Sequence, residues 1–134
     1  MSEITQSFSI LRTKLHRPQI TSDLVSRPQL VHRLEEGLQK PLTLVSAPAG
    51  YGKSTLLSSW LEQTKSPFTW LSLNEDDDDL PIFLRYVIAA IQLLFPSSMQ
   101  ETSKVLDAHD LPPFKSLTTS LINEIDDIEK NVIL

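Results

Sequence analysis

Apolar residues recur at helical spacing in four stretches of the chain. In the clearest stretch they follow one another at steps of three and four, as Phe114, Leu117, Leu121, Ile125 and Ile128, which places them on one helix face. Helices are therefore predicted over residues 27–38, 53–63, 82–95 and 114–129. Ser26 is the expected N-cap of the first helix. The third is apolar nearly all round, which favours burial on more than one side.

Short apolar runs between these helices predict strands. Residues 42–45 are Leu, Thr, Leu and Val, and residues 68–73 are rich in aromatic and β-favouring side chains. Residues 131–134 have the pattern of a strand that is beginning, and the stretch from Pro96 to Pro112 is expected to be a polar connector. Strands that alternate with helices are typical of the α/β class, so we expect a parallel sheet with helices on both faces, a three-layer fold.

Composition and charge narrow the classes of function. The 134 residues favour one domain, and the absence of Cys excludes disulfides and thiolate metal sites, so a cytoplasmic location is expected. The net charge of −5 argues against a broad basic surface, so we expect no direct DNA binding by this chain. The most apolar stretch is shorter than the roughly 20 residues of a membrane-spanning helix, and it contains Arg85, which disfavours a membrane protein.

Two of the three glycines lie in one short segment. Residues 47–54 read Ala-Pro-Ala-Gly-Tyr-Gly-Lys-Ser and fit the Walker A pattern, with Ala47 where the stricter pattern has Gly. The segment lies between a predicted strand and a predicted helix, as this pattern requires. Nucleotide binding is therefore predicted, through Ala47, Pro48, Ala49, Gly50, Tyr51, Gly52, Lys53, Ser54 and Thr55.

Each part of this segment has an expected chemical role. Gly50 and Gly52 let several backbone N–H groups converge on a phosphate chain. Lys53 supplies a cation for the β- and γ-phosphates, at the positive end of the helix that starts there. The Ser54 hydroxyl is the expected Mg²⁺ ligand, and Thr55 would lie near the α-phosphate.

The residues around this segment also resemble a known family. Residues 45–61, VSAPAGYGKSTLLSSWL, together with residues 70–76 and 83–91, look like the ATPase domain of MalT-type regulators. These are large ATP-binding LuxR-family transcription regulators of the STAND class of P-loop NTPases. The resemblance runs from about Leu11 to Leu134 and implies a P-loop NTPase fold that binds ATP or ADP with Mg²⁺.

The resemblance also implies an organisation of the chain. Residues 1–26 would be an N-terminal arm and residues 27–134 part of the nucleotide-binding domain, with Val25 and Arg27 in the segment that lies along the adenine. In the family a Walker B motif, further domains and a helix-turn-helix follow, so this chain is expected to be the first part of a regulator. Its partners would be nucleotide and the downstream domains, and an exposed sheet edge favours self-association.

A catalytic alternative stays open, because a small P-loop ATPase or kinase would carry the same segment. Hydrolysis is expected only in a full-length regulator, since the acidic half of the metal site would follow this chain.

Several other residues allow two interpretations. The acidic run 76–79 is either a divalent-metal cluster or, as we favour, a solvated turn before a helix. Arg85 either reaches solvent, pairs with a carboxylate or senses phosphate. Tyr51 either covers the nucleotide site or packs on the sheet, while Trp60 and Trp70 are expected in the core.

Overall fold

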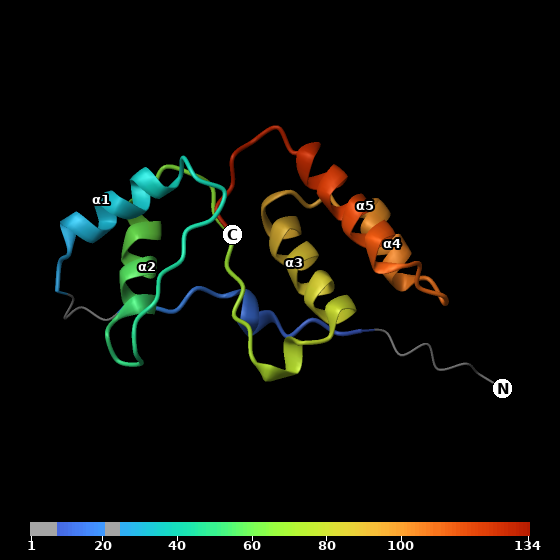
Figure 1. The fold of residues 1–134 in the computed structure, drawn as a ribbon, viewed down its shortest axis with the longest axis horizontal. Helices are drawn as coiled ribbons and strands as arrows, with labels where there is room; N and C mark the ends of the chain where they lie inside the picture. The colour runs from blue at the N-terminus through green and yellow to red at the C-terminus, as the bar shows by residue number, and fades with distance from the viewer. Residues whose placement is uncertain (1–7, 21–24) are drawn as a thin grey trace. The chain divides into compact units, whose positions relative to one another are not determined.

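The computed structural model describes residues 8–20 and 25–134, which form two compact units. Unit 1 comprises the chain up to His16 together with Phe68–Leu134, and unit 2 comprises Arg17–Pro67. Figure 1 shows the helices of each unit along the chain.

The described residues of unit 2 form two helices, α1 (Pro28–Gly37) and α2 (Lys53–Gln63). Leu34 of α1 is buried, as are Trp60 and Leu61 of α2, and the Trp60 indole donates to the Glu35 carboxylate at 2.6 Å. The helices predicted over 27–38 and 53–63 are thus confirmed. Ser26 as the N-cap is wrong, because α1 is preceded directly by Arg27, which makes no side-chain capping bond.

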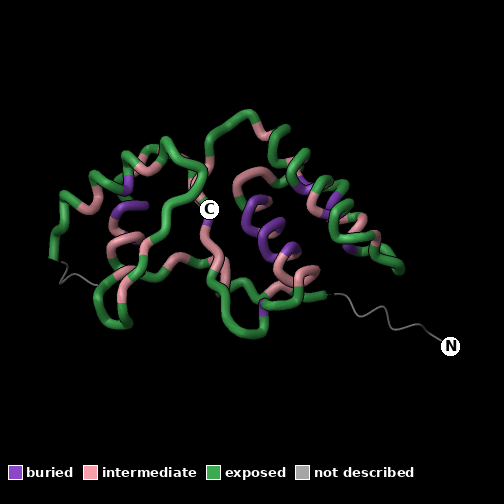
Figure 2. The backbone as a smooth tube through the Cα atoms, in the orientation of Figure 1, coloured by how far each residue is buried: buried purple, intermediate pink, exposed green. Residues whose placement is uncertain are grey.

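Where unit 1 is described, it consists of three longer helices and two short 3-10 helices. Its elements are η1 (Arg12–Leu15), η2 (Glu75–Asp77), α3 (Leu80–Leu94), α4 (Gln100–Asp107) and α5 (Phe114–Asp126). Apolar side chains from α3, α4, α5 and the turn before α4 make one buried cluster, which consists of Leu84, Val87, Ile88, Ile91, Met99, Leu106, Leu117 and Leu121. In Figure 2 the buried positions lie mainly along α3, with shorter buried stretches in α4 and α5.

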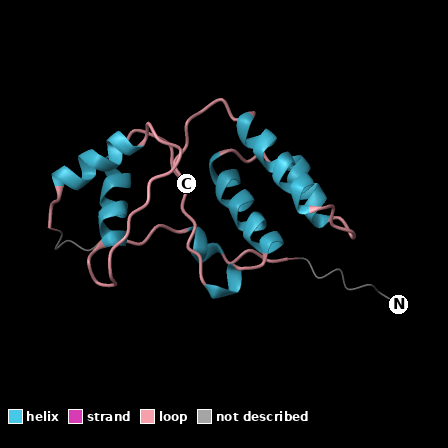
Figure 3. Ribbon diagram, viewed as in Figure 1, coloured by secondary structure: helices cyan, strands magenta, loops and turns pink. Residues whose placement is uncertain are grey.

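The predicted α/β fold is wrong: no strand or sheet occurs among the described residues, and Figure 3 shows helices joined by loops. One isolated parallel bridge pairs Phe68 with Ile133, and the Thr69 N–H donates to the Ile133 carbonyl at 2.8 Å. A parallel P-loop sheet with helices on both faces is therefore not part of this structure.

The incorrect prediction of strands has a physical cause. A strand is stable only when a neighbouring strand takes up its backbone hydrogen bonds. Residues 42–45 belong to no helix or strand, and Leu42 is 81% and Leu44 84% exposed, so the apolar pattern is not buried against a sheet. The connector expected between Pro96 and Pro112 instead contains α4.

The helices predicted over 82–95 and 114–129 are confirmed as α3 and α5, with ends that differ by a few residues. Across the described part of the chain no helix is long and apolar enough to cross a membrane.

A buried ion pair attaches the N-terminal segment of unit 1 to η2. The Lys14 ammonium donates to both carboxylate oxygens of Asp77, at 2.6 and 2.7 Å, and it also lies 5.0 Å from the centre of the Tyr86 ring. Asp77 further accepts from the Asn74 N–H at 2.8 Å. The Tyr86 hydroxyl in turn accepts from the Leu11 N–H at 3.1 Å. These contacts give residues 11–14 a defined place on unit 1.

Asp77→Asn is expected to make the stability of the chain less dependent on acid pH. The hydrogen bond from Lys14, followed by that from Asn74, lowers the pKa of Asp77 below its ordinary 3.8. A lowered pKa in the folded state stabilises the protein above pH about 3.8, and this contribution disappears as the pH falls through the folded-state pKa. Urea midpoints at pH 7 and pH 3 should therefore differ more in the wild type than in the variant, and equal differences would contradict the ion pair.

Candidate phosphate-binding loop

The segment with the Walker A pattern forms an exposed loop that leads into α2. Gly50 has φ +86° and Gly52 has φ +82°, a left-handed conformation that side chains other than glycine adopt only with strain. A Cβ atom at either position would meet no atom within 4 Å. The two glycines are therefore required by the backbone path of the loop and not by lack of space.

The start of α2 presents unpaired backbone donors. Gly52 is the N-cap and makes no side-chain capping bond. The first bond of the helix runs from the Leu56 N–H to the Gly52 carbonyl at 2.9 Å, so the N–H groups of the preceding residues have no acceptor within the helix. Ser54 and Thr55 are exposed there. The helix start thus offers N–H groups and hydroxyls to an anion.

Lys53 folds back over the loop that precedes it. Its ammonium donates to the Ala47 carbonyl, six residues earlier, and a turn bond from the Tyr51 N–H to the Pro48 carbonyl at 3.3 Å lies between them. The cation is therefore held at the mouth of the loop while it remains half-buried. A phosphate oxygen could replace the Ala47 carbonyl as its acceptor.

This donor set fits a phosphate chain better than it fits a metal ion. Lys53, the N–H groups at the start of α2 and two hydroxyls are all positive or donating groups. For Mg²⁺ the loop offers the Ser54 hydroxyl. No group of three metal-ligating side chains occurs in the residues that the structure describes.

The acidic run 76–79 makes contacts that stabilise unit 1. The Asp79 carboxylate caps α3 by accepting from the Ile82 N–H at 3.1 Å, as the interpretation of a turn before a helix predicts. Asp77, however, is buried with Lys14, which the sequence pattern did not indicate.

Val25 and Arg27 belong to the same unit as the loop. Val25 is 79% exposed and Arg27 is exposed at the start of α1. Among the described residues, no hydrogen bond or ion pair links either of them to the loop. Their expected place along the adenine is not tested by these contacts.

Arg85 pairs with a carboxylate, one of its three predicted roles. It donates to Asp107 at 2.6 Å and to the Leu106 carbonyl, so it joins α3 to the end of α4.

The aromatic residues have different surroundings. Trp60 is in the core as expected, whereas Trp70 is half-buried and donates to the Ser72 hydroxyl at 2.9 Å. Tyr51 is 64% exposed.

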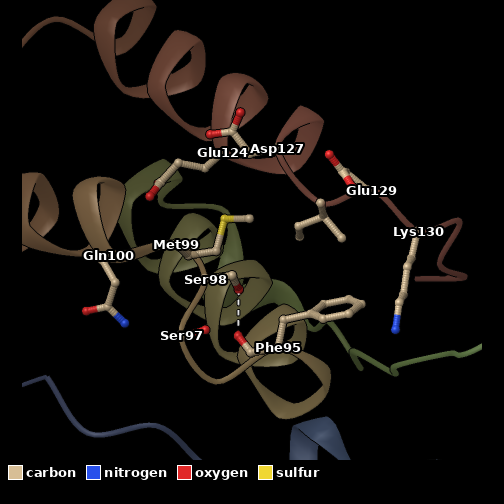
Figure 4. A pocket seen from close by; sticks show the side chains of 10 residues that line it. Phe95, Ser97, Ser98, Met99, Gln100, Glu124, Asp127, Glu129 and Lys130 are labelled. Carbon is tan, nitrogen blue, oxygen red and sulfur yellow. Dashed lines mark hydrogen bonds between the residues drawn. The ribbon is translucent and has the colours of Figure 1, made fainter.

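Sequence reasoning missed a pocket of about 500 Å³ in unit 1. Figure 4 shows Phe95 and Met99 at its apolar side, with Glu124 and Asp127 from the end of α5. Glu124 already has partners, because its carboxylate accepts from the N–H groups of Glu101 and Thr102, each at 2.9 Å. Burial raises the pKa of Glu124. The hydrogen bonds from Thr102 and Glu101 together lower it by more, so the pKa lies below its ordinary value. Glu124 thus caps α4, although it lies 22 positions after Thr102 in the sequence. A local sequence pattern cannot indicate a cap from so distant a residue.

Comparisons with known proteins show that this chain is similar to transcription regulators named MalT and to a protein kinase. The HTH-type transcriptional regulator MalT of Serratia proteamaculans is 34% identical over 118 residues, and that of Yersinia pestis 33% over 116 residues. The chain is similar to part of MalT. The serine/threonine-protein kinase PknK of Mycobacterium tuberculosis is 31% identical over 121 residues.

These matches cover most of this chain and little of each relative. They include 87–88% of the chain but 13% of the MalT proteins and 11% of PknK. No family model matches the chain. The similarity supports a relationship to MalT regulators, as the sequence resemblance predicted.

Proposed function

We propose that this chain binds ATP or ADP through residues 47–55 and serves as the nucleotide-binding part of a MalT-like transcription regulator. The observation that carries the proposal is the loop itself. Two left-handed glycines, an exposed helix start and the half-buried ammonium of Lys53 all lie within one segment. The similarity to MalT supports the regulator class.

Within this proposal each residue has a defined task. The N–H groups around Gly50 and Gly52 bind the phosphate chain, Lys53 contacts the β- and γ-phosphates, and Thr55 lies near the α-phosphate. Ser54 contributes one ligand to the Mg²⁺ that accompanies the nucleotide, and the metal neutralises phosphate charge when it is bound. Val25 and Arg27 would lie along the adenine, as the family resemblance implies, and both are exposed in the unit that carries the loop.

The proposal of a regulator also gives each part of the chain a role. Residues 1–26 act as an arm, and residues 27–134 supply the nucleotide-binding part. Nucleotide occupancy would then bias the conformation of a larger protein, while DNA contacts belong to other parts of that protein.

Catalytic turnover is a second candidate function, because one relative is named a kinase. Efficient phosphoryl transfer needs metal ligands beyond one hydroxyl and a residue that orients the nucleophile. The loop of this chain supplies the Ser54 hydroxyl, and among the described residues no group of three His, Asp or Glu side chains could hold a metal ion. We therefore propose binding without appreciable hydrolysis.

Equilibrium dialysis against ATP, ADP and AMP tests the proposal. ADP and ATP should bind at least about tenfold more tightly than AMP, because AMP lacks the phosphate groups that Lys53 contacts. Binding should weaken with added salt, as expected for phosphate attraction. Equal affinities for ADP and AMP, or no binding at millimolar nucleotide, would overturn it. Phosphate release that depends on Mg²⁺ and on Lys53 would favour the catalytic candidate instead.

A further inference from the structure

Two hydrogen bonds run in opposite directions between the N-terminal arm and the middle of α2. The Arg17 guanidinium donates to the Ser58 carbonyl at 2.7 Å, and the Ser58 hydroxyl donates to the Pro18 carbonyl at 2.8 Å. Ser58 is 1% exposed. We call this reciprocal pair of bonds, formed by Arg17, Pro18 and Ser58, the arm clasp.

The clasp contributes to holding α2 within unit 2. The bond from the Trp60 indole to Glu35 connects the same helix to α1. Arg17 also makes an ion pair with Glu62 at 3.4 Å, but the Glu62 side chain is 55% exposed, so solvent screens that pair. The bonds at the buried Ser58, which are less exposed than this ion pair, are therefore the stronger part of the attachment.

We propose that the arm clasp makes Arg17 a positioning residue for the phosphate-binding loop. This inference rests on the proposed function. Ser58 is five residues after Lys53, about 7.5 Å along the helix axis, so a shift or tilt of α2 at Ser58 moves its first turn as well. Binding groups must be held within roughly 0.5 Å of their productive positions. The clasp thus fixes where the N–H groups and Lys53 point.

Arg17 acts through α2 and not through its charge. Its guanidinium is bonded to a carbonyl in the middle of the helix, whereas Lys53 is at the first helical position. Loss of Arg17 should therefore weaken nucleotide binding by a similar factor at low and high salt. Loss of Lys53 should instead flatten the salt dependence, because it removes the cation that meets phosphate.

The test compares three variants of the full chain by equilibrium dialysis with ADP. Arg17→Gln removes the bond to the Ser58 carbonyl, and Ser58→Ala removes the bond to Pro18. Each should raise the Kd about five- to tenfold. Glu62→Gln is the matched control, because it removes the exposed ion pair and leaves both clasp bonds in place, and its Kd should stay within about twofold. Measurements are made at a temperature where circular dichroism shows every chain folded, so that altered stability does not alter the Kd.

The outcomes separate this inference from the proposed function. If the wild type binds ADP and both clasp variants bind it equally well, the clasp has no positioning role while nucleotide binding stands. A Glu62→Gln variant that weakens as much as Arg17→Gln would also overturn the inference, because the ion pair would then be responsible. If Arg17→Gln fails to fold, Ser58→Ala tests the clasp through its second bond, and an unchanged Kd in that variant overturns the inference. A wild type that binds no nucleotide refutes both proposals.

Discussion

Lys53→Ala should weaken the binding of ATP and ADP at least about tenfold, since charge-assisted hydrogen bonds to phosphate are among the strongest polar contacts. The ammonium is held over the loop by the Ala47 carbonyl, so it stands beside the donors at the start of α2. Truncation removes the single side-chain cation of the loop, while the backbone N–H groups of Gly50 and Gly52 remain. Residual binding is thus expected.

The matched control is Lys40→Ala, which removes an equal charge from an exposed position of the same unit. Its affinity for ADP should stay within about twofold of the wild type, because surface charges at a distance are screened by salt. Both variants should keep the helix content of the wild type by circular dichroism. A Lys53→Ala chain that is folded and binds ADP as tightly as Lys40→Ala would refute the role of the loop.

The helices of this chain could be predicted because their evidence is local. In α5, Leu117 and Leu121 are one turn apart and both are buried, so one short window of sequence contains the whole signal. α4 has no such signal. It begins after Met99 in a left-handed conformation and is capped by Glu124 from another helix, which a local pattern cannot indicate.

The predicted strands are wrong because a strand depends on a distant partner, which a local pattern does not show. The apolar run at 42–45 satisfies every local criterion for a buried strand, but burial is decided by what lies opposite it. Here Leu42 and Leu44 remain exposed. The contact that does form, between Phe68 and Ile133, joins residues that are far apart in the sequence.

Some features of the candidate site could likewise be predicted from the sequence, and others could not. The left-handed glycines and the helix start at Lys53 follow directly from the spacing of residues 50–54. The bond from Lys53 to Ala47 and the arm clasp at Ser58 depend on how the chain folds back on itself. Sequence therefore locates the groups of a site, and only three-dimensional contacts reveal what holds them.

Leu117→Ala should lower the free energy of unfolding by about 2–5 kcal/mol, the usual cost of removing a large side chain from a closely packed core. Leu117 is fully buried in the cluster that α3, α4 and α5 share, so no shift of a single helix can fill the cavity. Such a loss is a large fraction of the roughly 5–15 kcal/mol that stabilises an ordinary domain. Urea unfolding followed by circular dichroism measures it.

Ile122→Ala is the control for this change, because Ile122 is on the same helix but is 63% exposed. Truncation there removes little buried surface and should cost less than about 1 kcal/mol. The comparison tests which face of α5 is the inner one, since both variants lose an aliphatic side chain at a helical position. Similar losses in the two variants would mean that α5 does not pack through Leu117, and the three-helix core of unit 1 would then be wrong.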